Sequence, residues 1–173
     1  MSIHRRPAWQ RLQQLLVPIG HSHCVQPIRL MAHAGMSILS LFEAYAPSHP
    51  GASEAELQAV EAHHGRFLPA ALRELLRWSN GFRADMNRTF IDLWSTRELV
   101  EWNDASGLPR RLPGLLVVGT DGADSYYALD YRNNAREPAL AKMSSIIHEW
   151  DEVREVAPTF ADGLRRLIDE GWT

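Results

Sequence analysis

The spacing of apolar residues changes along the chain from a helical period to short runs. From residue 51 onward, apolar positions first recur every three or four residues, over two segments that end at a glycine or an Asn-Gly pair. Such a period is typical of helices that bury one face. The pattern therefore predicts two helices, over residues 54–65 and 68–79, after a shorter helix over residues 37–45.

Local end signals accompany both of the longer helices. The sequence Ser53 to Glu56 matches a capping box, in which a serine hydroxyl and a glutamate carboxylate satisfy free backbone N–H groups. Gly65 is expected to end the first helix. Pro69 is expected to occupy the first position of the second helix, and Asn80-Gly81 to end it in the left-handed conformation.

The later pattern consists of short runs rich in β-branched and aromatic residues, which are typical of strands. Strands are predicted over residues 89–94, 115–118, 125–129, 139–143 and 145–150. A second capping box predicts a brief helix from Ser95, with Leu99 and Trp102 inward, and a last helix begins at Thr159. This order predicts an α+β fold: an antiparallel sheet meander with helices packed around it, two of them N-terminal and one C-terminal.

Composition and charge narrow the class of protein. The 173 residues are 45% hydrophobic, and no apolar run approaches the length of a membrane-spanning helix. The net charge of −3 hides an asymmetry: residues 1–50 carry four arginines and one acidic residue, or +3, whereas residues 51–173 carry −6. Because nucleic-acid-binding domains are usually strongly basic, we expect neither direct nucleic-acid binding nor membrane insertion.

Residues 1–35 differ in character from the rest. Pro18 and Gly20 interrupt their apolar stretch before it reaches the length of a secretory signal core, and the single cysteine, Cys24, suits a reducing compartment, so a cytoplasmic location is expected. His21, His23 and Cys24 lack the spacing of a zinc site, and no metal is expected there. We expect a flexible N-terminal extension over residues 1–35 and a single domain over residues 36–173.

Four motifs in consistent order resemble the SUKH superfamily, which includes bacterial immunity proteins and fungal cell-wall-assembly regulators. They are an acidic helix followed by Leu-Pro, Leu-Leu and Asn-Gly; a strand and turn over residues 115–122; an Asp after the next strand; and the last helix. The likeness covers about residues 38–170. Its motif residues, expected to be structural, are Leu68, Pro69, Asn80, Gly81, Gly119, Gly122 and Asp130.

The resemblance implies a protein-binding module without catalysis or cofactor. For a bacterial member it implies an immunity protein that neutralises a toxin encoded nearby. The acidic domain suits a basic toxin, such as a nuclease. Two alternatives stay open: a non-catalytic regulatory scaffold or adaptor with the same fold, and a small hydrolase. A toxin gene next to this one would favour the first function. The sequence does not indicate an oligomeric state.

Catalytic signatures are missing from the sequence. It contains no nucleophile elbow, phosphate-binding loop or H-E-x-x-H motif. Asp121 and Asp124 are spaced to form a carboxylate pair, but Asp is also common in turns, and we favour that interpretation. No catalytic residue is therefore assigned.

Partner binding is expected on an acidic surface with one or two exposed aromatic anchors. Trp94, Trp102, Tyr126 and Tyr127 are the aromatic residues considered, and any one of them is more often core than surface. The candidates for partner binding are Asp85, Glu101, Trp102, Asp104, Asp121, Asp124 and Tyr126.

Overall fold

The computed structural model describes residues 37–87 and 89–171. The expected extension over residues 1–35 therefore lies outside the described residues. In chain order the elements are η2 (Ile38–Phe42), α1 (Glu54–His64), α2 (Ala70–Trp78), β1 (Phe82–Met86), β2 (Thr89–Leu93), α3 (Thr96–Ser106), α4 (Leu108–Arg111), β3 (Leu115–Thr120), β4 (Ser125–Asp130), β5 (Ala139–Ser144), η3 (Trp150–Glu152), β6 (Arg154–Ala157) and α5 (Phe160–Glu170).

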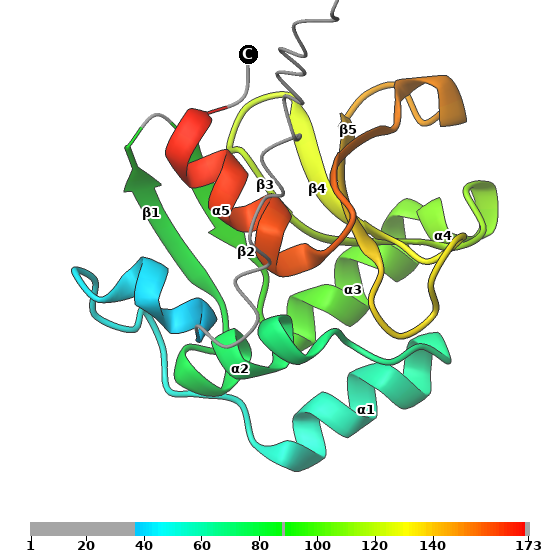
Figure 1. The fold of residues 1–173 in the computed structure, drawn as a ribbon. Coiled ribbons are helices and arrows are strands. Elements are labelled where there is room, and N and C mark those ends of the chain that lie inside the picture. Colours follow the sequence, from blue (N-terminus) through cyan, green and yellow to red (C-terminus); the bar gives the residue numbers. More distant parts are fainter. Residues whose placement is uncertain (1–36, 88, 172–173) are drawn as a thin grey trace, which may run out of the picture. The chain divides into compact units, whose positions relative to one another are not determined.

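The fold is α+β, as predicted. Six antiparallel strands follow one another in the order β1-β2-β3-β4-β5-β6, so the sheet is a meander. In chain order, α1 and α2 come before the sheet and α3 and α4 lie between β2 and β3. Figure 1 shows α5, which follows β6, lying on one face of the sheet. The helix predicted over residues 37–45 forms as the short 3₁₀ helix η2.

The helix ends follow their local signals with two exceptions. Both capping boxes form, at Ser53 and at Ser95, and Gly65 ends α1 in the left-handed conformation. Pro69, however, is the residue before the helix, and α2 ends on an extended Ser79. The expected left-handed conformation at Asn80-Gly81 is therefore wrong for Asn80, because only Gly81 has a positive φ, of 93°.

One strand was missed and one was wrongly placed. β1 forms because Phe82 and Met86 reach the core while Arg83, between them, pairs with Asp92 across the hairpin at 2.7 Å. The strand predicted over residues 145–150 is wrong. The Ser144 hydroxyl accepts hydrogen bonds from the N–H groups of Ile146 and Ile147, so the chain turns directly after β5. The last strand is β6 instead.

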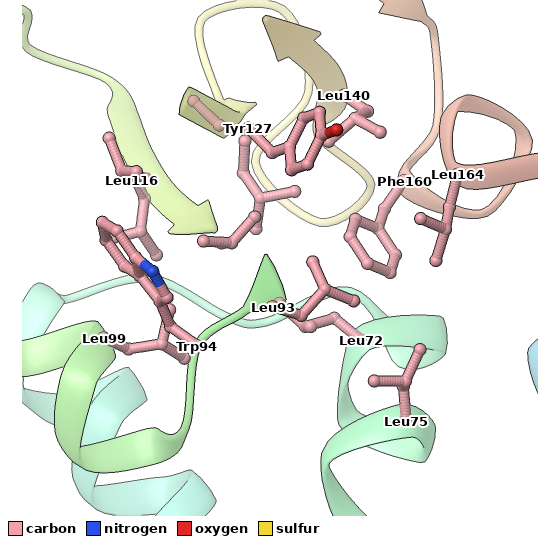
Figure 2. Close-up of a cluster of buried hydrophobic side chains, with 14 of the residues drawn as sticks. Leu72, Leu75, Leu93, Trp94, Leu99, Leu116, Tyr127, Leu140, Phe160 and Leu164 are labelled. Carbon is pink, nitrogen blue, oxygen red and sulfur yellow. The ribbon is translucent and has the colours of Figure 1, made fainter. Parts of the chain in front are cut away.

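The main core lies between the sheet and α2 and α5. Figure 2 shows Leu72 of α2 pointing toward Phe160 and Leu164 of α5, with Leu140 of the sheet beside them. Gly163 permits this approach, because a Cβ there would lie 2.5 Å from the Leu140 Cβ. No helix among the described residues is both long enough and apolar enough to cross a bilayer.

Candidate functional site

The Leu-Pro and Asn-Gly residues of the motif hold helices in place. Leu68 is buried, and its N–H donates to the Glu61 carboxylate at 2.9 Å. The Asn80 side chain accepts from the Thr96 N–H at 2.8 Å and donates to the Thr96 hydroxyl at 3.0 Å. This pair of bonds ties the end of α2 to the first turn of α3. Both motif residues therefore have contacts that serve the architecture.

The later motif residues lie in and beside the β3–β4 hairpin. Gly122, with a φ of 75°, occupies its turn, where a Cβ would come within 2.7 Å of the Phe90 ring. Gly119 packs against the backbone of β2. Asp130 ends β4, and its carboxylate binds both the backbone N–H and the guanidinium of Arg132. These contacts serve the packing of the β3–β4 hairpin and its neighbours.

Asn103 of α3, which the sequence analysis missed, stands in for a strand beside β3. Only the last two residues of β2 pair with β3. Within the described residues, the rest of the β3 edge that faces β2 therefore has no neighbouring strand. The buried Asn103 amide donates to the Val117 carbonyl at 2.8 Å and accepts from the Val117 N–H at 3.0 Å. It also donates to the Leu99 carbonyl at 2.8 Å. A polar residue four positions after Leu99, on the inward face of a helix, was the available signal.

Asp121 holds the β3–β4 turn. Its carboxylate accepts from the N–H groups of Ala123 at 3.0 Å and Ser125 at 3.1 Å, and it lies 3.0 Å from Nζ of Lys142. Burial by itself would raise the pKa of Asp121, but Lys142 and the two N–H groups together lower it below its usual range. The carboxylate is thus occupied within the fold, which supports the turn interpretation over a pair with Asp124.

We expect Asp121→Asn to reduce the amount by which the free energy of unfolding falls between neutral and acid pH. Because the folded pKa is depressed, the Asp121 carboxylate stabilises the fold above the unfolded pKa, and this contribution is lost as pH falls through the folded pKa. The variant should be less stable than wild type at neutral pH but lose less stability on acidification. Urea unfolding at neutral pH and at about pH 3 measures both effects. The exposed neighbour variant Asp124→Asn is the control, and equal acid dependence in wild type and Asp121→Asn would contradict the assignment.

A row of aromatic rings crosses from α3 to the segment after β5. The rings of Trp102 and Trp94 stack with centroids 6.0 Å apart, Trp94 meets Tyr126 edge to face at 5.8 Å, and Tyr126 lies 6.5 Å from His148. Such ring pairs add to the stability gained by burial. These four residues, here named the aromatic row, come from four separate segments of the chain, so only the folded structure assembles them.

Exposure differs sharply among the four aromatic residues considered from the sequence. Trp102 is 53% exposed, so the expectation that it faces inward is wrong. Leu99 and Asn103 fill the inward face of α3. Trp102 lies about 60° around the helix axis from Leu99, which places its ring at the margin of the buried face. Tyr127, the fourth aromatic considered, is buried and donates from its hydroxyl to the Phe90 carbonyl at 3.0 Å.

The acidic candidates fall into separate places. Glu101 is adjacent to Trp102 on α3, and Asp124 lies beside the segment after β5, where its carbonyl accepts from the Ser145 N–H at 2.8 Å. Asp104 faces α1 instead, and the 3.0 Å contact with His63 lowers the pKa of Asp104.

Asp85, the remaining acidic candidate, is exposed on β1, at the edge of the sheet. Its backbone carbonyl accepts from the Tyr45 hydroxyl at 3.1 Å. Trp102 and Tyr126 are therefore the candidates that belong to the aromatic row. Asp124 contacts the segment after β5 through its backbone, whereas Asp85 and Asp104 lie elsewhere.

A cavity of about 590 Å³ lies away from the aromatic row. It is lined by Glu54, Gln58, Glu61, Phe67, Leu68, Arg73 and Arg136. Arg73 pairs with both Glu54 and Glu61, and its distance to Glu61 is 2.7 Å. Hydrogen bonds from Arg77, Gln58 and Arg73 lower the pKa of Glu54 to about 2. A carboxyl group that stays ionised near neutral pH cannot act as a general acid, and these contacts stabilise the α1–α2 pair instead.

Metal ligands do not gather in the part of the chain that the structure describes. Across residues 37–87 and 89–171, no three His, Cys, Asp or Glu side chains are placed to hold an ion together. His21, His23 and Cys24, considered and set aside as a zinc site from the sequence, lie outside the described residues.

Comparison with known proteins identifies the family. Residues 51–166 match the model of the SMI1 / KNR4 family (SUKH-1). No curated protein matches the chain. The matched span holds every motif residue and the whole aromatic row, and it covers more than half of the 173 residues. The chain therefore belongs to the SMI1 / KNR4 family (SUKH-1).

Proposed function

We propose that this protein is a non-catalytic immunity protein that binds a cognate nuclease-type bacterial toxin and occludes its active site. The observation that carries this proposal is Trp102, which is 53% exposed, stacked on Trp94 and adjacent to Glu101. Exposed tryptophans are enriched where binding energy concentrates in protein interfaces. Because the stack already orders the ring, a partner loses little conformational entropy by contacting it.

Charge indicates what kind of partner fits. Residues 51–173 carry a net charge of −6. Glu101 is the chain neighbour of Trp102 in α3, and the Asp124 carbonyl accepts from the Ser145 N–H in the segment that carries His148. A nuclease needs a basic cleft for its phosphate backbone, and an acidic binding protein is steered toward such a cleft by long-range attraction. Residues 85–105 and 120–127 were the expected occluding segments, and the proposed surface is the part of them that adjoins the aromatic row, without Asp85 and Asp104.

The decisive experiment is a pull-down with the product of the neighbouring gene, followed by a toxicity rescue assay. We expect the wild-type chain to bind that toxin and restore growth. Trp102→Ala should weaken binding by roughly 30-fold or more and reduce rescue, because truncating a central tryptophan removes an anchor.

Phe67→Ala provides the matched control, since Phe67 is an aromatic residue 61% exposed outside the aromatic row. Wild-type binding without rescue would favour the regulatory scaffold over the immunity function. Equal affinities for Trp102→Ala and Phe67→Ala would remove the observation on which the proposal rests.

A further inference from the structure

Two isoleucines at the end of the aromatic row are left almost uncovered. Ile146 is 80% exposed and Ile147 is 50% exposed, and both lie in residues 145–149, here named the β5 loop. Figure 1 shows the connection that follows β5, in orange, extending beyond the end of the sheet. A single exposed isoleucine is ordinary, but two adjacent ones directly before His148, the last ring of the aromatic row, make an exposed apolar pair at the end of that row.

The β5 loop is held in one conformation by its own hydrogen bonds. The Ser144 hydroxyl accepts from the N–H groups of Ile146 and Ile147, both at 3.1 Å. The His148 ring bonds the Ser145 carbonyl at 3.0 Å, which keeps the ring beside Tyr126. A side-chain turn of this kind fixes the backbone locally. The isoleucines are thus presented by an ordered turn.

Contacts with other elements also fix the far end of the β5 loop. Glu149 pairs with Arg111 of α4 at 2.6 Å, and the Arg132 guanidinium lies 3.8 Å from the centre of the Trp150 ring. Both arginines are paired with carboxylates, Arg111 with Glu149 and Arg132 with Asp130 at 2.7 Å. Their charges are therefore balanced by acidic partners within the fold.

We propose that the β5 loop is the apolar anchor of the partner interface, and that Ile146 and Ile147 insert into an apolar pocket rimmed by basic residues on the toxin. This inference rests on the proposed function and names where its binding energy concentrates. An ordered apolar tip transfers its area out of water with little loss of conformational freedom. Basic side chains at the pocket rim can lie over the exposed ring of Trp102, and the net charge of −6 on residues 51–173 attracts them.

Charge favours such a partner over a second copy of this chain. A two-fold pairing through the β5 loop places the same patch on both sides of the contact. It would bring Asp124 and Glu152 of both copies together. Arg154 and Lys142 line the same hollow, but Lys142 pairs with Asp121, so the carboxylates outnumber the cations and the like charges are costly in an interface. A basic protein surface instead meets these carboxylates with opposite charge.

The double variant Ile146→Ser/Ile147→Ser tests the inference by surface plasmon resonance against the purified toxin domain. We expect roughly 100-fold faster dissociation and little change in the association rate, since anchors act mainly on dissociation. Phe67→Ser, which removes a large exposed apolar side chain elsewhere, should leave both rates unchanged. Circular dichroism and urea unfolding should give the wild-type fold and stability, because both isoleucines are exposed.

The possible failures are distinguishable. A wild-type chain that does not bind the toxin overturns the proposed function and the anchor with it. Toxin binding that is tight in wild type and equally tight in the double variant overturns the anchor alone. A wild-type dimer in sedimentation velocity that the double variant abolishes, with toxin affinity retained, shows that a second copy covers the β5 loop.

Discussion

Asn103→Ala is expected to lower the free energy of unfolding by about 3 kcal/mol, because it leaves a buried backbone edge without partners. Asn103 provides both hydrogen bonds that satisfy Val117 on that side of β3, and both residues are buried. Water cannot take over these bonds without opening the contact between α3 and β3. Each buried group left unsatisfied costs roughly 1–3 kcal/mol.

Two further variants separate the lost hydrogen bonds from the lost volume. Asn103→Leu keeps the side-chain size but supplies neither donor nor acceptor, so we expect it to be about as destabilising as Asn103→Ala. Asn133→Ala, in the exposed turn after β4, should change stability by less than about 0.5 kcal/mol. Urea unfolding followed by fluorescence measures all three. A cost below about 1 kcal/mol for both Asn103 variants would show that this amide does not support the β3 edge.

Gly119→Ala is expected to destabilise the fold by about 3 kcal/mol or more through a clash between strands. A Cβ at residue 119 would lie 2.2 Å from the backbone oxygen of Asp92 and 3.2 Å from the Leu93 Cα. Neither atom belongs to a flexible side chain, so the strands themselves must separate. β2 and β3 pair at only two residues of each strand, and this short ladder joins the β1–β2 hairpin to the rest of the sheet.

Gly65→Ala is the matched control for this prediction. Gly65 has a φ of 62°, but no atom lies within 4 Å of the position of its missing Cβ. The alanine there should cost only about 1 kcal/mol, from the left-handed conformation alone. Thermal and urea unfolding of the two variants therefore compare steric with conformational cost. Equal effects would contradict the close approach of β2 and β3 at Gly119.

Both predictions concern residues that look ordinary in the sequence. Gly119 was identified only through a family motif, and Asn103 was not identified at all. The reason is that each acts on a strand reached by the folded chain: Gly119 on β2, and Asn103 on the edge of β3. Leu68 and Asn80 were likewise recognised through the family motif, although their partners Glu61 and Thr96 lie only 7 and 16 residues away along the chain.

The candidate binding surface divides in the same way. The sequence presented Trp102, Tyr126, Glu101 and Asp124 as separate candidates, and folding brings the two aromatic residues into one row of rings. It could not exclude Tyr127, because alternate residues of a strand face opposite sides and the buried side depends on what packs there. It also assigned a strand to the β5 loop, whose isoleucines are typical of strands by composition but are exposed in a turn.

From sequence alone, the starts of α1 and α3, the Asp121 turn, the α+β order and the family follow, because each rests on patterns among residues close in the chain. The β1–β2 hairpin, the support of β3 by Asn103 and the exposure of Trp102 and Ile146 required the folded molecule. These features depend on which surfaces are left over after distant segments have packed. Burial is a property of the whole fold, and a local pattern constrains it only where one face is plainly apolar.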